Sequence, residues 1–106
     1  MSVIMTFRVE GDPDKLEQLA AENGDVLREI AEDAKKAGVL AHRFYGTDDG
    51  QMMVIDEWPD EQSFHSFFEE NGGRIGPMME AAGVTSEPQP KFWRKLETHD
   101  EYGWGA

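Results

Sequence analysis

One histidine stands where its ring could act as a base on a small molecule. His42 lies between Leu40 and Phe44, in a run that alternates with the period of a β-strand. Histidine titrates near neutral pH and can take a proton from a bound substrate, so His42 is the candidate catalytic residue. A lone histidine on an apolar strand face is also explained as a core residue held by one hydrogen bond. Both interpretations stay open at this point.

Two amides and a set of aromatic and methionine side chains are the candidate substrate-binding residues. Asn23 and Asn71 fall on the apolar stripes of predicted helices, where each amide could hold a substrate oxygen. A helix cap or a loop hydrogen bond explains each of them equally well. The other candidates could line an adaptable aromatic pocket or could simply be core, and they are Phe44, Trp58, Phe64, Phe67, Phe68, Met78 and Met79.

The chain has three histidines and no cysteine. The chain has 106 residues and no cysteine, which excludes thiolate catalysis, iron–sulfur ligation and disulfide bonds. His42, His65 and His99 show no metal-ligand spacing, such as an i, i+4 pair on one helix face. We expect His65 and His99 to lie in solvent, and the site to contain no metal and no cofactor.

The charge and length of the chain limit its partners. Ten Lys and Arg stand against 22 Asp and Glu, and the formal charge of -12 repels nucleic-acid phosphates and anionic lipids. We therefore expect no nucleic acid and no membrane as a partner, but a small apolar or aromatic ligand. No apolar run approaches the ~18 residues of a membrane span, and the N-terminus lacks the order of a signal peptide. A soluble, cytoplasmic protein of one domain is expected.

The first half of the chain predicts a strand and a long helix. Residues 3–10 alternate apolar and polar side chains, as a strand does. Asp12 and Pro13 then provide an N-cap and a proline at the first helical position. The apolar stripe of the helix stays in phase across Asn23 and Gly24, which predicts one helix with a weak point there, and Gly38 ends it.

A hairpin follows, and its pairing decides which side chains share a face. Residues 39–46 and 51–58 predict two antiparallel strands joined by a loop at 47–50. With a four-residue loop, His42 lies opposite Ile55 and Phe44 lies opposite Met53. The other face then carries Arg43, Tyr45, Met52, Val54 and Asp56, and a slip of one residue would exchange the faces.

The second half predicts two helices, a strand and a tail. A phenylalanine-rich helix begins after Pro59, breaks at Gly72 and Gly73, and is followed by a short helix from Pro77 to Gly83. Residues 91–97 predict the last strand. We expect one domain over residues 1–97 and an acidic tail over 98–106 that bears Tyr102 and Trp104.

The order strand, helix, strand, strand, helix, strand predicts an α+β, ferredoxin-like βαββαβ fold. Its four-stranded antiparallel sheet has both helices on one face. The helix-free face is too apolar for solvent and predicts a homodimer in which two sheets pack face to face. Arg8, Arg43 and Asp56 are the candidate ion-pair partners in that interface. The face is predicted to carry Ile4, Thr6, Arg8, Tyr45, Met52, Val54, Asp56 and Trp93.

A family resemblance rests on the residues around the third strand. The run Ile55-Asp56-Glu57-Trp58-Pro59-Asp60-Glu61, with Ser63-Phe64 and Phe67-Phe68 after it, resembles the antibiotic biosynthesis monooxygenase-like family over residues 1–97. The resemblance implies a dimeric α+β barrel. It also implies one of several functions, which include cofactor-independent oxygenation of aromatic quinols, haem degradation and isomerisation.

Two functions remain, and a third is weaker. An oxygenase would need one base and a few hydrogen-bond donors in an apolar pocket, and His42 would be that base. The alternative is a dimeric binding or accessory protein without catalysis. Haem-degrading relatives have an Asn in the sheet, a pocket Trp and an iron-binding His on the following helix. Trp58 could correspond to the pocket Trp, because it stands at the end of a strand. However, residues 71–79 contain no histidine and the first strand contains no Asn.

Overall fold

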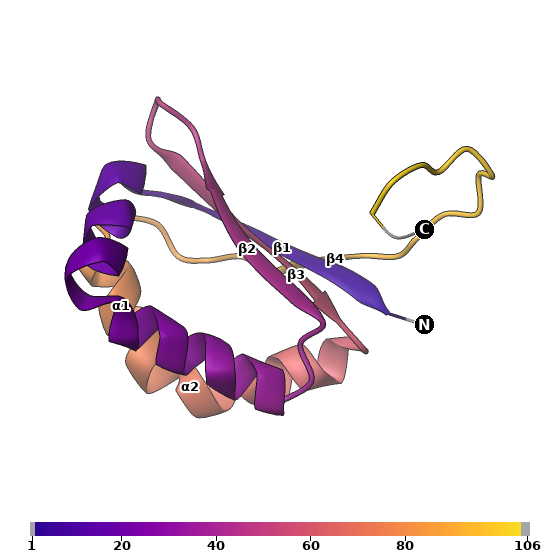
Figure 1. The fold of residues 1–106 in the computed structure, drawn as a ribbon, viewed down its shortest axis with the longest axis horizontal. Coiled ribbons are helices and arrows are strands. Elements are labelled where there is room, and N and C mark those ends of the chain that lie inside the picture. Colours follow the sequence, from indigo (N-terminus) through magenta and orange to yellow (C-terminus); the bar gives the residue numbers. More distant parts are fainter. Residues whose placement is uncertain (1, 105–106) are drawn as a thin grey trace.

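Four strands and two helices form the molecule, in a computed structural model that describes residues 2–104. Their order is β1 (Val3–Glu10), α1 (Pro13–Lys36), β2 (Ala41–Gly46), β3 (Gln51–Trp58), α2 (Glu61–Ala81) and β4 (Lys91–Trp93). The strands pair antiparallel in the order β2-β3-β1-β4. Both helices lie on one side of this sheet (Figure 1). The expected ferredoxin-like βαββαβ arrangement is confirmed.

The core lies between the sheet and the helices, because alternate strand residues face inward. In β1 the inward residues are Met5, Phe7 and Val9, and all three are buried. Trp58 at the end of β3 and Phe64 on α2 are almost completely buried and pack edge to face, with ring centroids 5.9 Å apart. These two rings fix the start of α2 on the sheet.

Helix α1 begins and bends where the sequence predicts. The Asp12 carboxylate accepts a hydrogen bond from the Asp14 amide at 2.9 Å, and Pro13 follows as the first helical residue. The helix leaves helical geometry at Asn23, with φ of −145° and ψ of 52°, and then continues to Lys36. The expected weak point is confirmed, and α1 consists of two segments joined by a kink.

Helix α2 does not break at Gly72 and Gly73, and the prediction of two separate helices was wrong. One helix runs from Glu61 to Ala81 and includes Pro77. Its buried residues recur on one helix face, and half-buried Phe68 and Asn71 bridge the interval between Phe67 and Ile75, so one stripe faces the sheet along the whole length. The packing of this stripe outweighs the low helix propensity of the glycines. The stripe consists of Phe64, Phe67, Ile75, Met78, Met79 and the capping Ala82.

The β2–β3 hairpin pairs one residue away from the predicted register. His42 pairs with Asp56 and Phe44 pairs with Val54, whereas Ile55 and Met53 were expected. The reason lies in the loop: the Thr47 amide donates to the Gln51 carbonyl at 2.9 Å, and only three residues separate this pair. The last of them, Gly50, has a φ of +90°, which is typical of three-residue hairpin loops that end on a left-handed residue. The inward residues of β3 are therefore Met52, Val54, Asp56 and Trp58.

The last strand is shorter than predicted, because its partner strand ends. β4 covers Lys91–Trp93 and not residues 91–97. It runs antiparallel to β1, and Trp93 already pairs with Ile4, next to the first residue of β1. Residues 94–104 continue beyond the sheet without helix or strand (Figure 1). The predicted boundary after residue 97 stays a prediction, and residues 105–106 of the tail lie outside the described part.

Candidate active site

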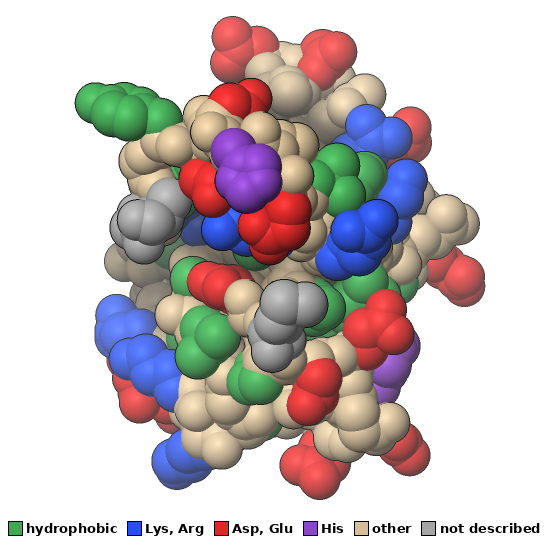
Figure 2. Space-filling model, turned by 90° about the vertical axis from the view of Figure 1, so that its right-hand side faces the viewer, with side chains coloured by type: hydrophobic (Ala, Val, Ile, Leu, Met, Phe, Trp, Pro, Cys, Tyr) green, Lys and Arg blue, Asp and Glu red, His purple; other side chains and the backbone are tan. Residues whose placement is uncertain are grey.

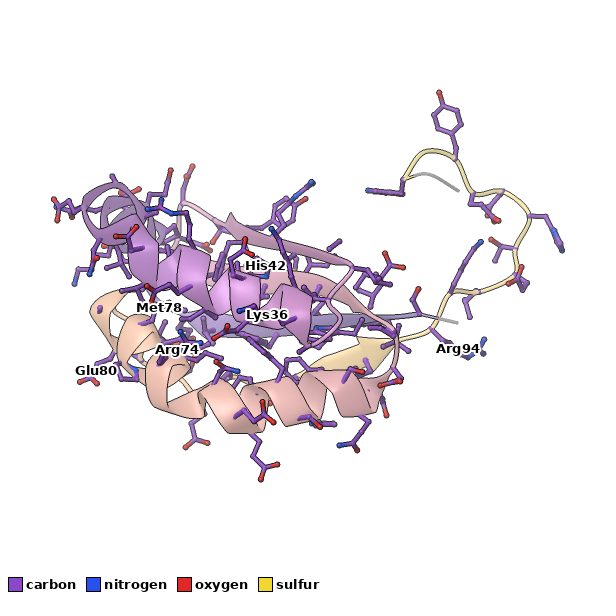
Figure 3. The ribbon with its side chains drawn as sticks, turned by 60° about the horizontal axis from the view of Figure 1, so that its bottom comes forward. Lys36, His42, Arg74, Met78, Glu80 and Arg94 are labelled. Carbon is purple, nitrogen blue, oxygen red and sulfur yellow. The ribbon has the colours of Figure 1, made fainter. Side chains whose placement is uncertain are left out.

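A small apolar cavity lies between α1, β2 and α2. Its volume is about 50 Å³. Figure 3 shows the elements that enclose it, with His42 on the sheet beside α1 and Met78 on α2. Half-buried α1 side chains such as Leu27 and Ile30 close one side. The lining residues are Phe7, Leu27, Ile30, Ala31, Ala34, His42, Phe44, Val54, Asp56, Phe64, Phe67, Phe68, Ile75, Met78 and Met79.

His42 and Asp56 are the polar residues of this lining, and they form a pair. The cross-strand register places them opposite each other, with His42 Nδ1 and Asp56 Oδ1 2.7 Å apart. The second carboxylate oxygen, Oδ2, accepts a hydrogen bond from Trp58 Nε1 at 3.1 Å. Asp56 is only 6% exposed, so both of its oxygens are satisfied inside the core.

This geometry selects one tautomer of the histidine. An ionised carboxylate only accepts hydrogen bonds, so Nδ1 must carry the hydrogen that lies between His42 and Asp56. Nε2 of the neutral ring then keeps its lone pair. The ring also packs edge to face on Phe44, with centroids 5.1 Å apart, and about a third of the side chain (34%) is exposed. His42 thus connects the cavity to solvent and offers one proton acceptor.

The structure brings most of the predicted pocket wall together. Phe44, Phe64, Phe67, Phe68, Met78 and Met79 all line the cavity, as does His42. Trp58 is completely buried and contacts Phe64 and Phe67, but it does not line this cavity. Its position is that of a core residue whose indole N–H holds Asp56.

The two asparagines lie elsewhere. Asn23 is exposed at the kink of α1, so its expected place on the buried stripe was wrong. The phase argument assumed a regular helix through this residue, and the kink removes that regularity. Asn71 is half-buried, but its Nδ2 donates to the Phe67 carbonyl at 3.0 Å and its Oδ1 accepts from the Arg74 guanidinium. Neither amide lines the cavity.

Sequence reasoning missed Asp56, which it placed on the opposite face. Gly50, just before the third strand, fits a three-residue loop as well as the expected four-residue one, and only the shorter loop places every second residue from Met52 inward. The α1 side chains of the lining were also missed as site residues. His65 and His99 are exposed, as expected.

The one-residue shift in register also changes which β3 side chains lie on the helix-free face of the sheet. Met53, Ile55 and Glu57 occupy the places that were expected for Met52, Val54 and Asp56. Glu57 accepts a hydrogen bond from the Ser2 hydroxyl. The face still joins apolar and cationic side chains, with Ile4, Thr6, Arg8, Ala41, Arg43, Tyr45, Met53, Ile55, Glu57, Lys91 and Trp93 directed to it.

The order and pairing of the elements define the structural class, which is the α+β fold shared with antibiotic biosynthesis monooxygenases. SnoaB, a cofactor-independent oxygenase from Streptomyces nogalater, matches over 94% of this chain and 98% of that chain, with a TM-score of 0.62 and 20% identity. An antibiotic biosynthesis monooxygenase matches over 91% and 99%, with a TM-score of 0.62 and 15% identity. A conserved protein from Methanosarcina mazei Go1 matches over 91% and 94%, with a TM-score of 0.66 and 16% identity.

These likenesses confirm the fold that the sequence resemblance implied. No protein-family model and no curated protein matches the sequence. At identities of 15–20% the structural likeness shows the fold alone, so an activity has to be argued from the residues of the site. Within residues 2–104, no helix is long and apolar enough to cross a membrane.

Proposed function

We propose that this protein is a cofactor-independent oxygenase that oxidises an aromatic or quinol-type small molecule. The observation that supports it most directly is the His42–Asp56 pair on the wall of an otherwise apolar, aromatic cavity. His42 is the base, and Asp56 is a positioning residue that keeps Nδ1 protonated and Nε2 free. The likeness of the fold to SnoaB is consistent with this reaction class.

The reaction requires only a base, a dry cavity and molecular oxygen. His42 takes a proton from an acidic CH₂ or hydroxyl group of the substrate, and the aromatic rings delocalise the negative charge that remains. The carbanion transfers electrons to O₂. One oxygen atom enters the substrate as a carbonyl group and the other leaves as water, so CH₂ and O₂ give C=O and H₂O. The substrate supplies all the electrons, and no other reductant is consumed.

The cavity must open before such a substrate can bind. A volume of about 50 Å³ is well below the roughly 300–1,000 Å³ of small-molecule sites. Helix α1 is the wall that can move, because it is already kinked at Asn23 and its lining side chains Leu27 and Ile30 are only half-buried. We expect the substrate to enter between α1 and β2, next to His42.

Oxygen uptake by the purified protein with anthrone- or quinol-type substrates tests this function. We expect His42→Ala to lower kcat by about 10²-fold or more, because general-base catalysis contributes about 10²–10⁴. Asp56→Asn should lower kcat less, because His42 remains. The matched control is His65→Gln, an exposed histidine outside the cavity lining, which should leave uptake unchanged. Equal uptake by the wild type and His42→Ala contradicts the role of His42.

A binding or accessory protein without catalysis is the second candidate. Besides His42, the side chains that line the cavity in the described part of the chain include no hydrogen-bond donor that could stabilise an oxyanion, and this favours simple binding. Calorimetric titration with the same aromatic compounds distinguishes the two functions. Saturable binding without oxygen uptake supports the second candidate and contradicts the first.

We also propose that a second copy covers the helix-free face of the sheet. Ile4, Met53 and Ile55 are only half-buried there, and Tyr45 and Trp93 remain 49% and 48% exposed. A face that joins apolar and charged side chains in this way is typical of an interface. The twofold pairing of two identical faces is the simplest arrangement that buries both of them.

A further inference from the structure

A second cavity lies at the other end of the layer between the helices and the sheet. It is found where β1 ends, α1 begins and α2 ends, on the left in Figure 1, and its volume is about 10 Å³. Its α1 residue, Leu16, precedes the kink at Asn23, whereas the α1 residues of the first cavity lie within 27–34 and follow the kink. The two cavities therefore lie beside different segments of α1.

A single layer of side chains separates the two cavities. Five residues line both of them, and these are Phe7, Phe44, Val54, Met78 and Met79. Methionine side chains are unbranched and adaptable, so rotation of Met78 or Met79 can open a passage wide enough for a very small molecule. The second cavity is thus a side chamber of the candidate active site.

The second cavity has no polar lining side chain among the described residues, whereas His42 and Asp56 line the first. A volume of about 10 Å³ is close to the minimum for one water molecule, but a buried water also needs two to four polar partners. Apolar cavities stay dry and take up small apolar molecules such as xenon. The residues that line only the second cavity are Val9, Leu16, Met52, Met53, Ala82 and Val84.

The position of this chamber suits a second reactant that arrives by its own path. In the proposed reaction the substrate enters next to His42 and fills the first cavity, so O₂ has to come from elsewhere. Val84, which follows α2, is half-buried, so its end of the second cavity lies near the surface. Figure 2 looks onto the opposite end of the molecule, where acidic and cationic side chains lie among the hydrophobic ones. The chamber lies away from that charged end.

We infer that the second cavity is the dioxygen site of the proposed oxygenase. The inference rests on the proposed function and adds the place that holds its second reactant. O₂ is a small apolar molecule, and the chamber excludes water but not O₂. It keeps O₂ one side-chain layer away from the substrate while His42 removes the proton.

The reaction then runs through the shared wall. O₂ passes Met78 and Met79 and takes the electrons of the substrate carbanion, so that a C–O bond forms and O₂ is reduced to a peroxide. The peroxide takes back the proton held by His42. Loss of the remaining C–H proton with cleavage of the O–O bond gives the C=O group and water, and no other reductant is needed.

The paramagnetism of O₂ tests the site without any substrate. O₂ speeds the nuclear relaxation of methyl groups that it approaches, and the methionine methyl groups can be labelled with ¹³C. Met52 lines only the second cavity and is 4% exposed, whereas the equally buried Met5 lines neither cavity and is the matched control. Under oxygen pressure we expect the enhancement at Met52 to be several-fold larger than at Met5. An enhancement at Met52 no larger than at Met5 overturns the inference.

Filling each cavity separately gives a kinetic test. Val9→Ile adds a methyl group to the second cavity only, and we expect it to raise the KM for O₂ several-fold and to leave the KM for the aromatic substrate unchanged. Ala31→Val fills the first cavity only and should have the opposite pattern. An unchanged KM for O₂ in a folded Val9→Ile variant overturns the inference.

The two measurements distinguish this inference from the proposed function. Oxygen uptake together with equal relaxation at Met52 and Met5 contradicts the dioxygen site and leaves the oxygenase intact. Strong relaxation at Met52 without oxygen uptake on any of the aromatic substrates contradicts the oxygenase, and with it the catalytic use of the chamber.

Discussion

The carboxylate of Asp56 is held from two sides, by His42 Nδ1 and by Trp58 Nε1, and it joins the core to the candidate active site. A buried carboxylate is tolerated only when its oxygens have partners. Trp58 therefore acts on the site through Asp56, although its ring does not line the cavity. The same tryptophan packs on Phe64 and Phe67, so packing and site geometry depend on one side chain.

Removing the indole N–H should reveal this dependence. We expect Trp58→Phe to lower the free energy of unfolding by about 1–3 kcal/mol, because one buried carboxylate oxygen loses its donor. In an Asp56→Leu background the same change should cost much less, since no carboxylate is left unpaired. Urea unfolding of the four proteins gives the coupling energy. An equal cost in both backgrounds contradicts the link between Trp58 and Asp56.

At the scale of elements, a glycine in the β2–β3 loop and a glycine in α2 have opposite effects on the stability of the fold. Gly50 needs its φ of +90° to close the three-residue hairpin loop, and a Cβ there would lie 3.3 Å from the Gly11 carbonyl. Gly72 lies inside α2, and a Cβ there would meet nothing within 4 Å.

Alanine should therefore change stability in opposite directions at these two positions. We expect Gly50→Ala to destabilise the protein by about 1–2 kcal/mol, because alanine resists the left-handed region. Gly72→Ala should stabilise it by about 0.4–1 kcal/mol, because alanine has less freedom to lose on folding. Denaturant unfolding measures both. Stabilisation by Gly50→Ala contradicts the loop geometry, and destabilisation by Gly72→Ala contradicts the continuous helix.

The N-cap of α2 should make stability depend on pH. The Asp60 carboxylate accepts hydrogen bonds from the Ser63 amide and hydroxyl, both at 2.8 Å, and these bonds hold the pKa of Asp60 below its usual value. The ionised form therefore adds stability at pH values above the pKa of the unfolded chain. That stability is lost as the pH falls through the lower pKa of the folded state.

An asparagine cap isolates this contribution. Asn caps a helix about as well as Asp but carries no charge, so Asp60→Asn should be less stable than the wild type at pH 6. The difference should shrink as the pH is lowered below about 4. Urea unfolding at several pH values measures it, and a difference that stays constant across this range contradicts the role of the charge.

At the scale of the whole molecule, the two sides of the sheet face different surroundings. The inner side is covered by the helices, while the outer side keeps half-buried Met53 and Ile55 next to cationic side chains. The proposed dimer would cover the outer side.

A single charge on the outer face should separate the copies. Ile55→Glu introduces a carboxylate at the centre of this face, and the fold should tolerate it because Arg43 lies directly opposite on β2. We expect the variant to sediment as a monomer at concentrations where the wild type is a dimer. Ala20→Glu, an exposed site on α1, is the control and should not change the mass. A dimeric Ile55→Glu variant contradicts the interface.

The sequence by itself determined the order of the elements, the start and kink of α1, and the inward side of β2. These features follow from local signals: alternating side chains, the Asp12-Pro13 cap and the position of Asn23. They also led to the apolar cavity wall, since Phe44, Phe64 and Met78 stand on predicted inner faces.

Only the tertiary structure decided the pairing of β2 with β3 and the continuity of α2. A hairpin loop of three or four residues differs little in local energy, yet the choice moves Asp56 from one face of the sheet to the other. Packing of the α2 stripe against the sheet likewise outweighs the local preference to break at Gly72. Contacts between residues far apart in the chain therefore placed His42 beside a carboxylate.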